Sequence, residues 1–260
     1  MTIRSTNESW LYFRNLFLAR SKRIDPDITK ITGLTHKQAQ SIGQSLSIFQ
    51  AGESGEGRLA KQILSYERKF IDDDYRKACI LFVQEEGRHG RILAKILAAL
   101  GYKKREASVA NNLFIFTRRI LDISFKLLVL LVAELVGLTY YSYLAALLKE
   151  EQLVLALEEI CNDEVDHLFF HLNYFHLLIK ENRPSRFFYV PASLFIGVAS
   201  FTFVALEHRQ SIACAGGAPI LFLLEGYKAA FNLTECMSRG QRSTSILREK
   251  ISNLTGKNKN

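Results

Sequence analysis

The sequence predicts an all-α protein built around a four-helix bundle. Long segments with helical apolar spacing run without breakers, and the 260 residues include only four prolines, a pattern typical of long helices. The motif Glu-x-x-His occurs within two of these segments, at Glu86 with His89 and at Glu164 with His167. A chain of this length can bury one large core, so we expect one principal domain with appended segments.

Charge and cysteine usage narrow the class of protein. The net charge of +8 favours an anionic partner such as a membrane surface. This charge is also the sole support for nucleic acid as a partner, which we do not favour. The four cysteines form no Cys-x-x-Cys pair, which excludes a zinc ribbon or a rubredoxin-type iron centre. Residues 1–8 are polar and lack a secretory signal pattern, so we expect a cytoplasmic protein, with 187–206 as its candidate for peripheral or integral membrane contact.

Residues 1–33 are expected to form an N-terminal amphipathic segment with one short helix. Trp10, Phe13 and Phe17 belong to its apolar stripe. Its basic residues are Arg14, Arg20, Lys22 and Arg23. Such a helix either packs on the bundle or lies on a membrane. Asp25-Pro26 is expected to end it.

Residues 34–182 are expected to form the bundle itself. Its four helices are predicted over about 35–70, 73–100, 108–148 and from the charged turn at 149–151 to about 180. Thr35 with Gln38 fits a capping box, Asp72 begins an N-cap cluster, and Gly101 is a helix stop. Glycines at 52, 55 and 57 indicate either a kink in the first helix or the close approach of a neighbouring helix or a ligand.

Residues 183–240 are expected to form a hydrophobic helical extension, followed by a disordered basic tail over 241–260. The stretch 187–206 carries no charged residue and is long enough to span a membrane, although Pro191 and Gly197 interrupt it. Three interpretations stay open: helices that cover the bundle or line an apolar pocket, a true membrane span, or a monotopic membrane contact.

Six residues form two matched sets within the bundle. They are Glu56, Glu86 and His89 in the first set, and Glu134, Glu164 and His167 in the second. The two glutamates of each set lie 30 residues apart, so an antiparallel hairpin would turn near residues 71 and 149, where charged breaks occur. Glu53 is an alternative to Glu56 because both lie on one helix face. The internal symmetry favours Glu56.

These residue types indicate a site for two metal ions. Residues three apart share a helix face, so each Glu-x-x-His can present both side chains to one ion. Four carboxylates carry about four negative charges, which two divalent ions would balance, and such groups are costly to bury without a partner. Carboxylate and imidazole ligands suit iron or manganese. The expected cofactor is two iron ions, with a manganese–iron pair as the alternative.

Over residues 35–180 the pattern resembles the ferritin-like di-iron carboxylate superfamily, which implies a ferritin-like four-helix bundle. The resemblance implies that Glu86 and Glu164 bridge two irons, that Glu56 and Glu134 are terminal ligands, and that His89 and His167 bind one iron each. It also implies that Glu85 and Asp163, which precede the two motifs, hydrogen-bond the ligand histidines. The stretch from Glu134 to Leu168 further resembles aldehyde-deformylating oxygenases. Rubrerythrins share the ligands, but their cysteine-rich iron domain has no counterpart here.

Two further residues are expected to support the ligands. His171 shares a face with Glu164 and is interpreted as a buried, hydrogen-bonded histidine, with an extra ligand as the alternative. Tyr140 belongs to a group of tyrosines of which one could hydrogen-bond Glu134.

The resulting functional hypothesis is a dioxygen-dependent di-iron oxidoreductase, of the oxygenase or hydroxylase type, that acts on a hydrophobic small molecule. An external electron donor is needed because no flavin or iron–sulfur motif is visible. The alternatives are an iron-binding or peroxide-scavenging protein, a membrane-associated quinone-type hydroxylase, and a hydroxylase of transfer RNA.

Overall fold

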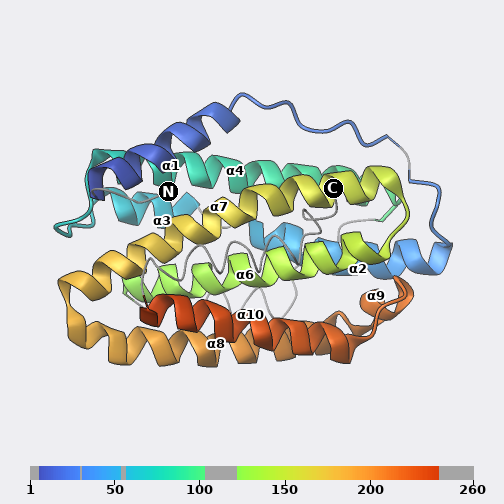
Figure 1. Ribbon diagram of the computed structural model, residues 1–260. Helices are drawn as coiled ribbons and strands as arrows, with labels where there is room; N and C mark the ends of the chain where they lie inside the picture. The colour runs from blue at the N-terminus through green and yellow to red at the C-terminus, as the bar shows by residue number, and fades with distance from the viewer. Residues whose placement is uncertain (1–5, 30, 54–56, 103–121, 240–260) are drawn as a thin grey trace, which may run out of the picture.

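The computed structural model describes residues 6–29, 31–53, 57–102 and 122–239, and these residues fold as an all-helical bundle without a strand (Figure 1). Its elements are α1 (Thr6–Arg20), α2 (His36–Glu53), α3 (Gly57–Leu64), α4 (Asp73–Ala99), α6 (Ile123–Leu147), α7 (Glu151–Glu181), a 3₁₀ turn at Arg183–Ser185, α8 (Arg186–Glu207), α9 (Arg209–Cys214) and α10 (Pro219–Arg239). The predicted all-α fold class is confirmed. The expected tail at 241–260 and the first part of the helix expected from residue 108 lie outside the described residues.

The first bundle helix is shorter than predicted. The capping box at its start is confirmed, because the Thr35 amide donates to Gln38 Oε1 (2.9 Å) and the Gln38 amide donates to Thr35 Oγ1 (3.3 Å). Helix α2 ends at Glu53 within the glycine-rich stretch, and α3 ends at Leu64. The expected end near residue 70 is therefore wrong. The carbonyl of Phe70 accepts a hydrogen bond from Trp10 Nε1 (2.7 Å), outside any helical ladder.

Helix α4 begins and ends where the sequence indicates. The Asp72 side chain accepts from the Tyr75 amide (2.9 Å), which caps the first turn. At the other end Gly101 has a φ of 66°, and the Tyr102 amide donates to the carbonyl of Leu97 (2.9 Å). Helix α1 packs along α4. It ends at Arg20 instead of Asp25-Pro26, and the chain then follows α4, whose Lys95 donates to the Pro26 carbonyl.

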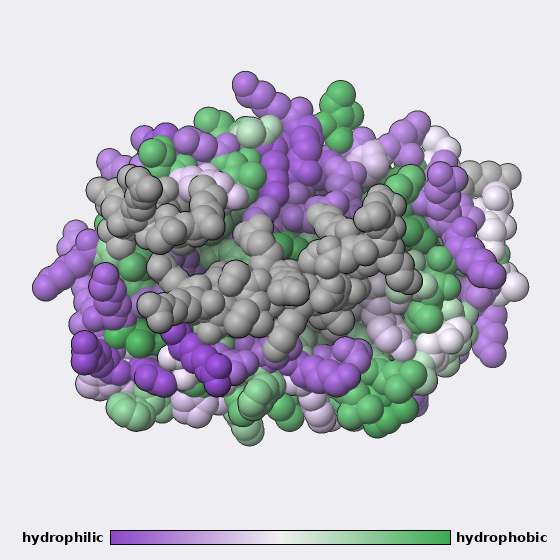
Figure 2. All heavy atoms as spheres, viewed as in Figure 1, coloured by the Kyte–Doolittle hydropathy of each residue, from purple (hydrophilic) through white to green (hydrophobic). Residues whose placement is uncertain are grey.

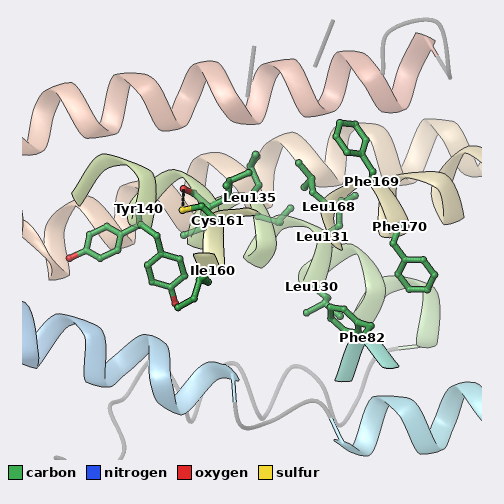
Figure 3. Close-up of a cluster of buried hydrophobic side chains, with 14 of the residues drawn as sticks. Phe82, Leu130, Leu131, Leu135, Tyr140, Ile160, Cys161, Leu168, Phe169 and Phe170 are labelled. Atoms are coloured by element: carbon green, nitrogen blue, oxygen red, sulfur yellow. Dashed lines mark hydrogen bonds between the residues drawn. The ribbon is translucent and has the colours of Figure 1, made fainter. Parts of the chain in front are cut away.

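Helices α6 and α7 form the second hairpin, with its turn at residues 148–150. The core lies between the two hairpins, and Phe82 of α4, Leu130 of α6 and Phe170 of α7 all contribute to it (Figure 3). The predicted midpoints at residues 71 and 149 agree with the observed connections, which place residues of α4 and α7 at the same level of the bundle. Glu134 of α6 is buried in this core.

Helices α8 and α10 pack against each other and along α6 (Figure 1). Their close approach depends on Gly226, where a Cβ atom would lie 2.2 Å from the ring of Phe201. By length and composition, α6 and the Arg183–Glu207 segment could each cross a membrane. The apolar window of α6 is 78% buried, as expected for a core helix, whereas that of Arg183–Glu207 is only 22% buried.

Candidate metal centre

Helices α4 and α7 bring the two Glu-x-x-His motifs together. One ligand atom from each of Glu86, His89, Glu164 and His167 lies within 4.8 Å of the other three, and all four side chains are buried. Within each motif the helix places Glu and His on one face. The facing helices then join the two faces into a single cluster that can hold metal ions and is compatible with a di-iron site.

The histidines face the carboxylates crosswise. His167 Nδ1 lies 2.9 Å from Glu86 Oε1, and His89 Nδ1 lies 3.1 Å from Glu164 Oε1. Each imidazole therefore points its Nδ1 atom at the carboxylate supplied by the other helix. Helix α6 adds Glu134, whose Oε2 lies 4.0 Å from His167 Nδ1.

The outer ring nitrogens are held by the acidic residues that precede the motifs. His167 Nε2 donates to Glu85 Oε2 (2.9 Å), and His89 Nε2 donates to Asp163 Oδ2 (3.3 Å). A histidine that donates through Nε2 keeps the lone pair of Nδ1 free for a metal. The structure thus places Glu85 and Asp163 where they fix both the tautomer and the ring orientation.

Three arginines surround these two acids, and the sequence did not indicate them. Arg23 Nη2 lies 2.6 Å from Asp163 Oδ1 and 3.4 Å from Glu85 Oε1, Arg20 Nη1 lies 3.5 Å from Asp163, and Arg88 Nη1 lies 3.7 Å from it. Burial acts to raise the pKa of Asp163, but the hydrogen bonds and charges of His89 and Arg23 outweigh it and lower that pKa to about 2. The sequence feature that could have predicted these arginines is the pair of acids next to the motifs, because buried acids need countercharges.

Glu53, the last residue of α2, lies close enough to the cluster for its charge to interact with Glu86 and Glu164. Tyr141 donates a hydrogen bond to Glu53 Oε1 (2.9 Å). Withdrawal from solvent and then the charges of Glu86 and Glu164 raise the Glu53 pKa well above its ordinary value. Glu56 lies outside the described residues, so the preference for Glu56 as a ligand stays a prediction.

Without metal, the buried groups share protons. Burial first, and then repulsion between the carboxylates, raises the pKa values of Glu86 and Glu134. Burial acts to raise the Glu164 pKa as well, but its close contacts with Glu134, His167 and His89 lower it well below its ordinary value. Burial acts to lower the His89 pKa, but the hydrogen bond to Asp163 and the nearby carboxylate of Glu164 raise it to about 9. The cluster is therefore a coupled set in which imidazolium and carboxylate charges compensate each other.

Two expected supporting residues make other contacts than those predicted. His171 is fully buried as expected, but neither ring nitrogen has a hydrogen-bond partner among the described residues, and its ring packs edge-on against Phe82 (4.9 Å). Burial lowers its pKa to about 3. Tyr140 does not reach Glu134, because its hydroxyl bonds Ser45 and Ser211.

Tyr141, the next residue, contacts the cluster instead. Successive helical residues point about 100° apart, so only one of the two tyrosines can face the site, and the sequence pattern did not decide which.

No protein-family model, curated protein or solved structure matches the chain. The chemistry of the site is therefore argued from its own atoms. Within the described parts of the chain, the buried atoms that make no hydrogen bond include Glu86 Oε1, Glu134 Oε1, Glu164 Oε2, His89 Nδ1 and His167 Nδ1. Buried polar atoms are normally bonded. These five belong to the residues of the cluster and are the atom types that bind metals, so the donor set fits a metal centre.

Proposed function

We propose that this cluster binds two metal ions, most simply iron, and that the protein is a dioxygen-dependent oxidoreductase. The observation that carries the proposal is the orientation of the two histidines. Among the described residues, their inward Nδ1 atoms and the carboxylate oxygens Glu86 Oε1 and Glu164 Oε2 make no hydrogen bond, while their outward Nε2 atoms are bonded to acids. Mixed carboxylate and imidazole donors suit iron or manganese and offer no thiolate for softer metals.

The ligand assignment follows the two-fold repetition of the site. Glu86 and Glu164 each lie near both histidines, the position expected of bridging carboxylates. Glu134, with Glu53 or Glu56, would supply the terminal carboxylates. Four carboxylates and two neutral imidazoles would balance the charge of two divalent ions, as in the ferritin-like di-iron carboxylate proteins that the motif spacing resembles.

In such a site the metals would supply electrons to dioxygen. The protein would exclude water, orient the ligand side chains and control their protonation. Leu128, Leu131 and Leu138 of α6 are buried on the same helix as Glu134, and Phe125 of α6 is partly buried. Apolar walls favour a hydrophobic small-molecule substrate. Glu85 and Asp163 would keep both imidazoles neutral at Nδ1 while they bind.

Metal analysis of the full-length chain after anaerobic reconstitution with ferrous iron tests the proposal. We expect about two irons per chain, and His167→Ala should lose most of this metal. His176→Ala is a matched control, because His176 lies on the same helix and bonds the Cys236 carbonyl, away from the cluster. Failure to bind iron or manganese, or equal metal content in the two variants, would sink the proposal.

Oxygen uptake then separates an oxidoreductase from an iron-storage protein. With ascorbate as an external electron donor, an oxidoreductase should consume oxygen continuously and faster when an apolar acceptor molecule is added. A storage or scavenging protein should stop when its ferrous iron is exhausted, whichever apolar molecule is present.

A further inference from the structure

The outer side of α8 is an uninterrupted apolar stripe. Its residues recur every three or four positions, and all of them are exposed: Phe188, Pro191, Phe195, Ala199, Phe203 and Leu206. The most exposed phenylalanine of the stripe is Phe195, with 76% of its surface in solvent. No charged residue lies between Arg186 and Glu207, so the stripe runs unbroken from Phe188 to Leu206, about 28 Å of helix. Monomeric proteins rarely expose so long a contiguous apolar surface without a use for it.

Helix α10 extends this surface. Ile220, Leu221, Leu224 and Phe231 are also exposed, and α10 packs directly against α8. Hydrophobic residues lie along the lower edge of the molecule in Figure 2, where Figure 1 places α8. The stripe on α8 and these four residues of α10 are together called the α8 face.

The charges around the α8 face are predominantly positive. In each ion pair on α10 the cation is the more exposed partner: 68% for Lys228 against 37% for Glu225, and 69% for Arg239 against 30% for Glu235. Exposed Arg186 begins α8, and at the other end exposed Arg209 follows Glu207, an exposed anion that ends α8. The sequence after α10 adds to this charge, because residues 241–260 contain five Lys or Arg and one Glu, a net of +4.

We propose that the α8 face lies in the boundary between the headgroups and acyl chains of an anionic lipid bilayer, with the axis of α8 parallel to the membrane. Apolar side chains flanked by arginines and lysines are the pattern of interfacial helices, which bind through buried apolar area and attraction to anionic lipid. The arginines at both ends of α8 would contact headgroups while the phenylalanines enter the acyl region.

The packing of α8 excludes a membrane-crossing orientation. Its inner side, with Gly197, Phe201 and Val204, is buried in the fold, and α8 runs along α6. If α8 crossed a bilayer, the parallel bundle helices would cross it too, and their charged outer surfaces would face lipid. Only one side of α8 is available, as a monotopic contact requires.

A second copy of the chain fits the α8 face less well. Parallel pairing of two α8 helices would place each arginine near its own counterpart, which opposes like charges. Antiparallel pairing would place Arg186 of one copy near both Glu207 and Arg209 of the other, which gives little net attraction, whereas an anionic bilayer attracts both arginines.

Co-sedimentation of the full-length chain with lipid vesicles tests the proposal. We expect binding to vesicles of phosphatidylcholine mixed with phosphatidylglycerol, weaker binding to phosphatidylcholine alone, and a loss of binding in high salt. The double variant Phe195→Ser, Phe203→Ser should bind the mixed vesicles at least about tenfold more weakly, because both rings leave the acyl region. All changes are at exposed positions, and helical circular dichroism checks that the variants stay folded.

Leu155→Ser is the matched control, because Leu155 is an exposed apolar residue of α7 outside the α8 face. It should bind vesicles as the wild type does. Equal binding by the double variant and the wild type would overturn the proposal, as would no binding of the wild type to mixed vesicles. If light scattering instead shows a wild-type dimer that the double variant dissociates, the occupant of the α8 face is a second copy of the chain.

Discussion

Replacement of Asp163 by asparagine should weaken both the fold and metal binding. Asp163 accepts hydrogen bonds from His89 Nε2 (3.3 Å) and Arg23 Nη2 (2.6 Å) at a fully buried position, with Arg20 and Arg88 nearby. Asparagine keeps the shape of the side chain but removes the charge. It leaves three guanidinium groups short of one anionic partner.

The size of the effect follows from the pKa of Asp163. This pKa falls from 3.8 to about 2, and each unit corresponds to about 1.4 kcal/mol. The ionised carboxylate therefore contributes about 2 kcal/mol to stability at neutral pH, a contribution lost as the pH falls from about 4 through about 2. Since Asp163 also orients a proposed ligand, we expect metal affinity to fall roughly 10–100-fold.

Denaturant unfolding of the metal-free protein and competitive metal titration measure the two effects. The control is Glu159→Gln, because Glu159 also pairs with Arg88 but contacts neither histidine. We expect it to change metal affinity less than about threefold, the level of a partly exposed ion pair. Equal losses of metal affinity in the two variants, or unchanged affinity in Asp163→Asn, would refute the idea that Asp163 acts through His89.

Four more substitutions, the last of them a control, test individual side chains. His171→Leu should stabilise the metal-free protein by about 1–2 kcal/mol in denaturant unfolding, because it removes an unpaired buried imidazole; a destabilised variant would reveal a hidden partner. The His208 pKa is lowered by burial to about 4, so the unfolded chain binds this proton first as the pH falls. Wild type should lose about 2 kcal/mol between pH 8 and pH 5 through this group, a loss that His208→Gln should not show. Tyr141→Phe removes the hydrogen bond to Glu53 and should weaken metal binding severalfold in titration, whereas Tyr140→Phe should reduce only stability; equal metal affinities would contradict this division.

The sequence was sufficient for the features that follow from helical periodicity. The spacing within each Glu-x-x-His motif fixes a shared helix face, and the matched 30-residue intervals predict hairpins that bring both motifs to one level. The structure places Glu86, His89, Glu164 and His167 together. The caps at Thr35 and Asp72 were also predictable, because capping depends on local chemistry alone.

Features that depend on tertiary contacts were not predictable. The turn between the first two bundle helices starts early, and the carbonyl of Phe70 bonds Trp10, which is distant in sequence. Tyr140 and Tyr141 have similar sequence surroundings, and only the rotation of α6 decides which faces the site. Arg20 and Arg23 were interpreted as the basic side of an amphipathic helix, whereas they contact acids that belong to α4 and α7.

The acids of the site therefore form two layers with different countercharges. The outer acids, Glu85 and Asp163, are paired with arginines. Within the part of the chain that the structure describes, the inner acids Glu86, Glu134 and Glu164 pair only with histidines. Histidines that bind a metal are neutral, so once their protons leave, the inner layer lacks compensating charge unless cations occupy it. Arginines that neutralised both layers would compete with metals, whereas this separation keeps the arginines on the outer acids and leaves the inner oxygens available for metal binding.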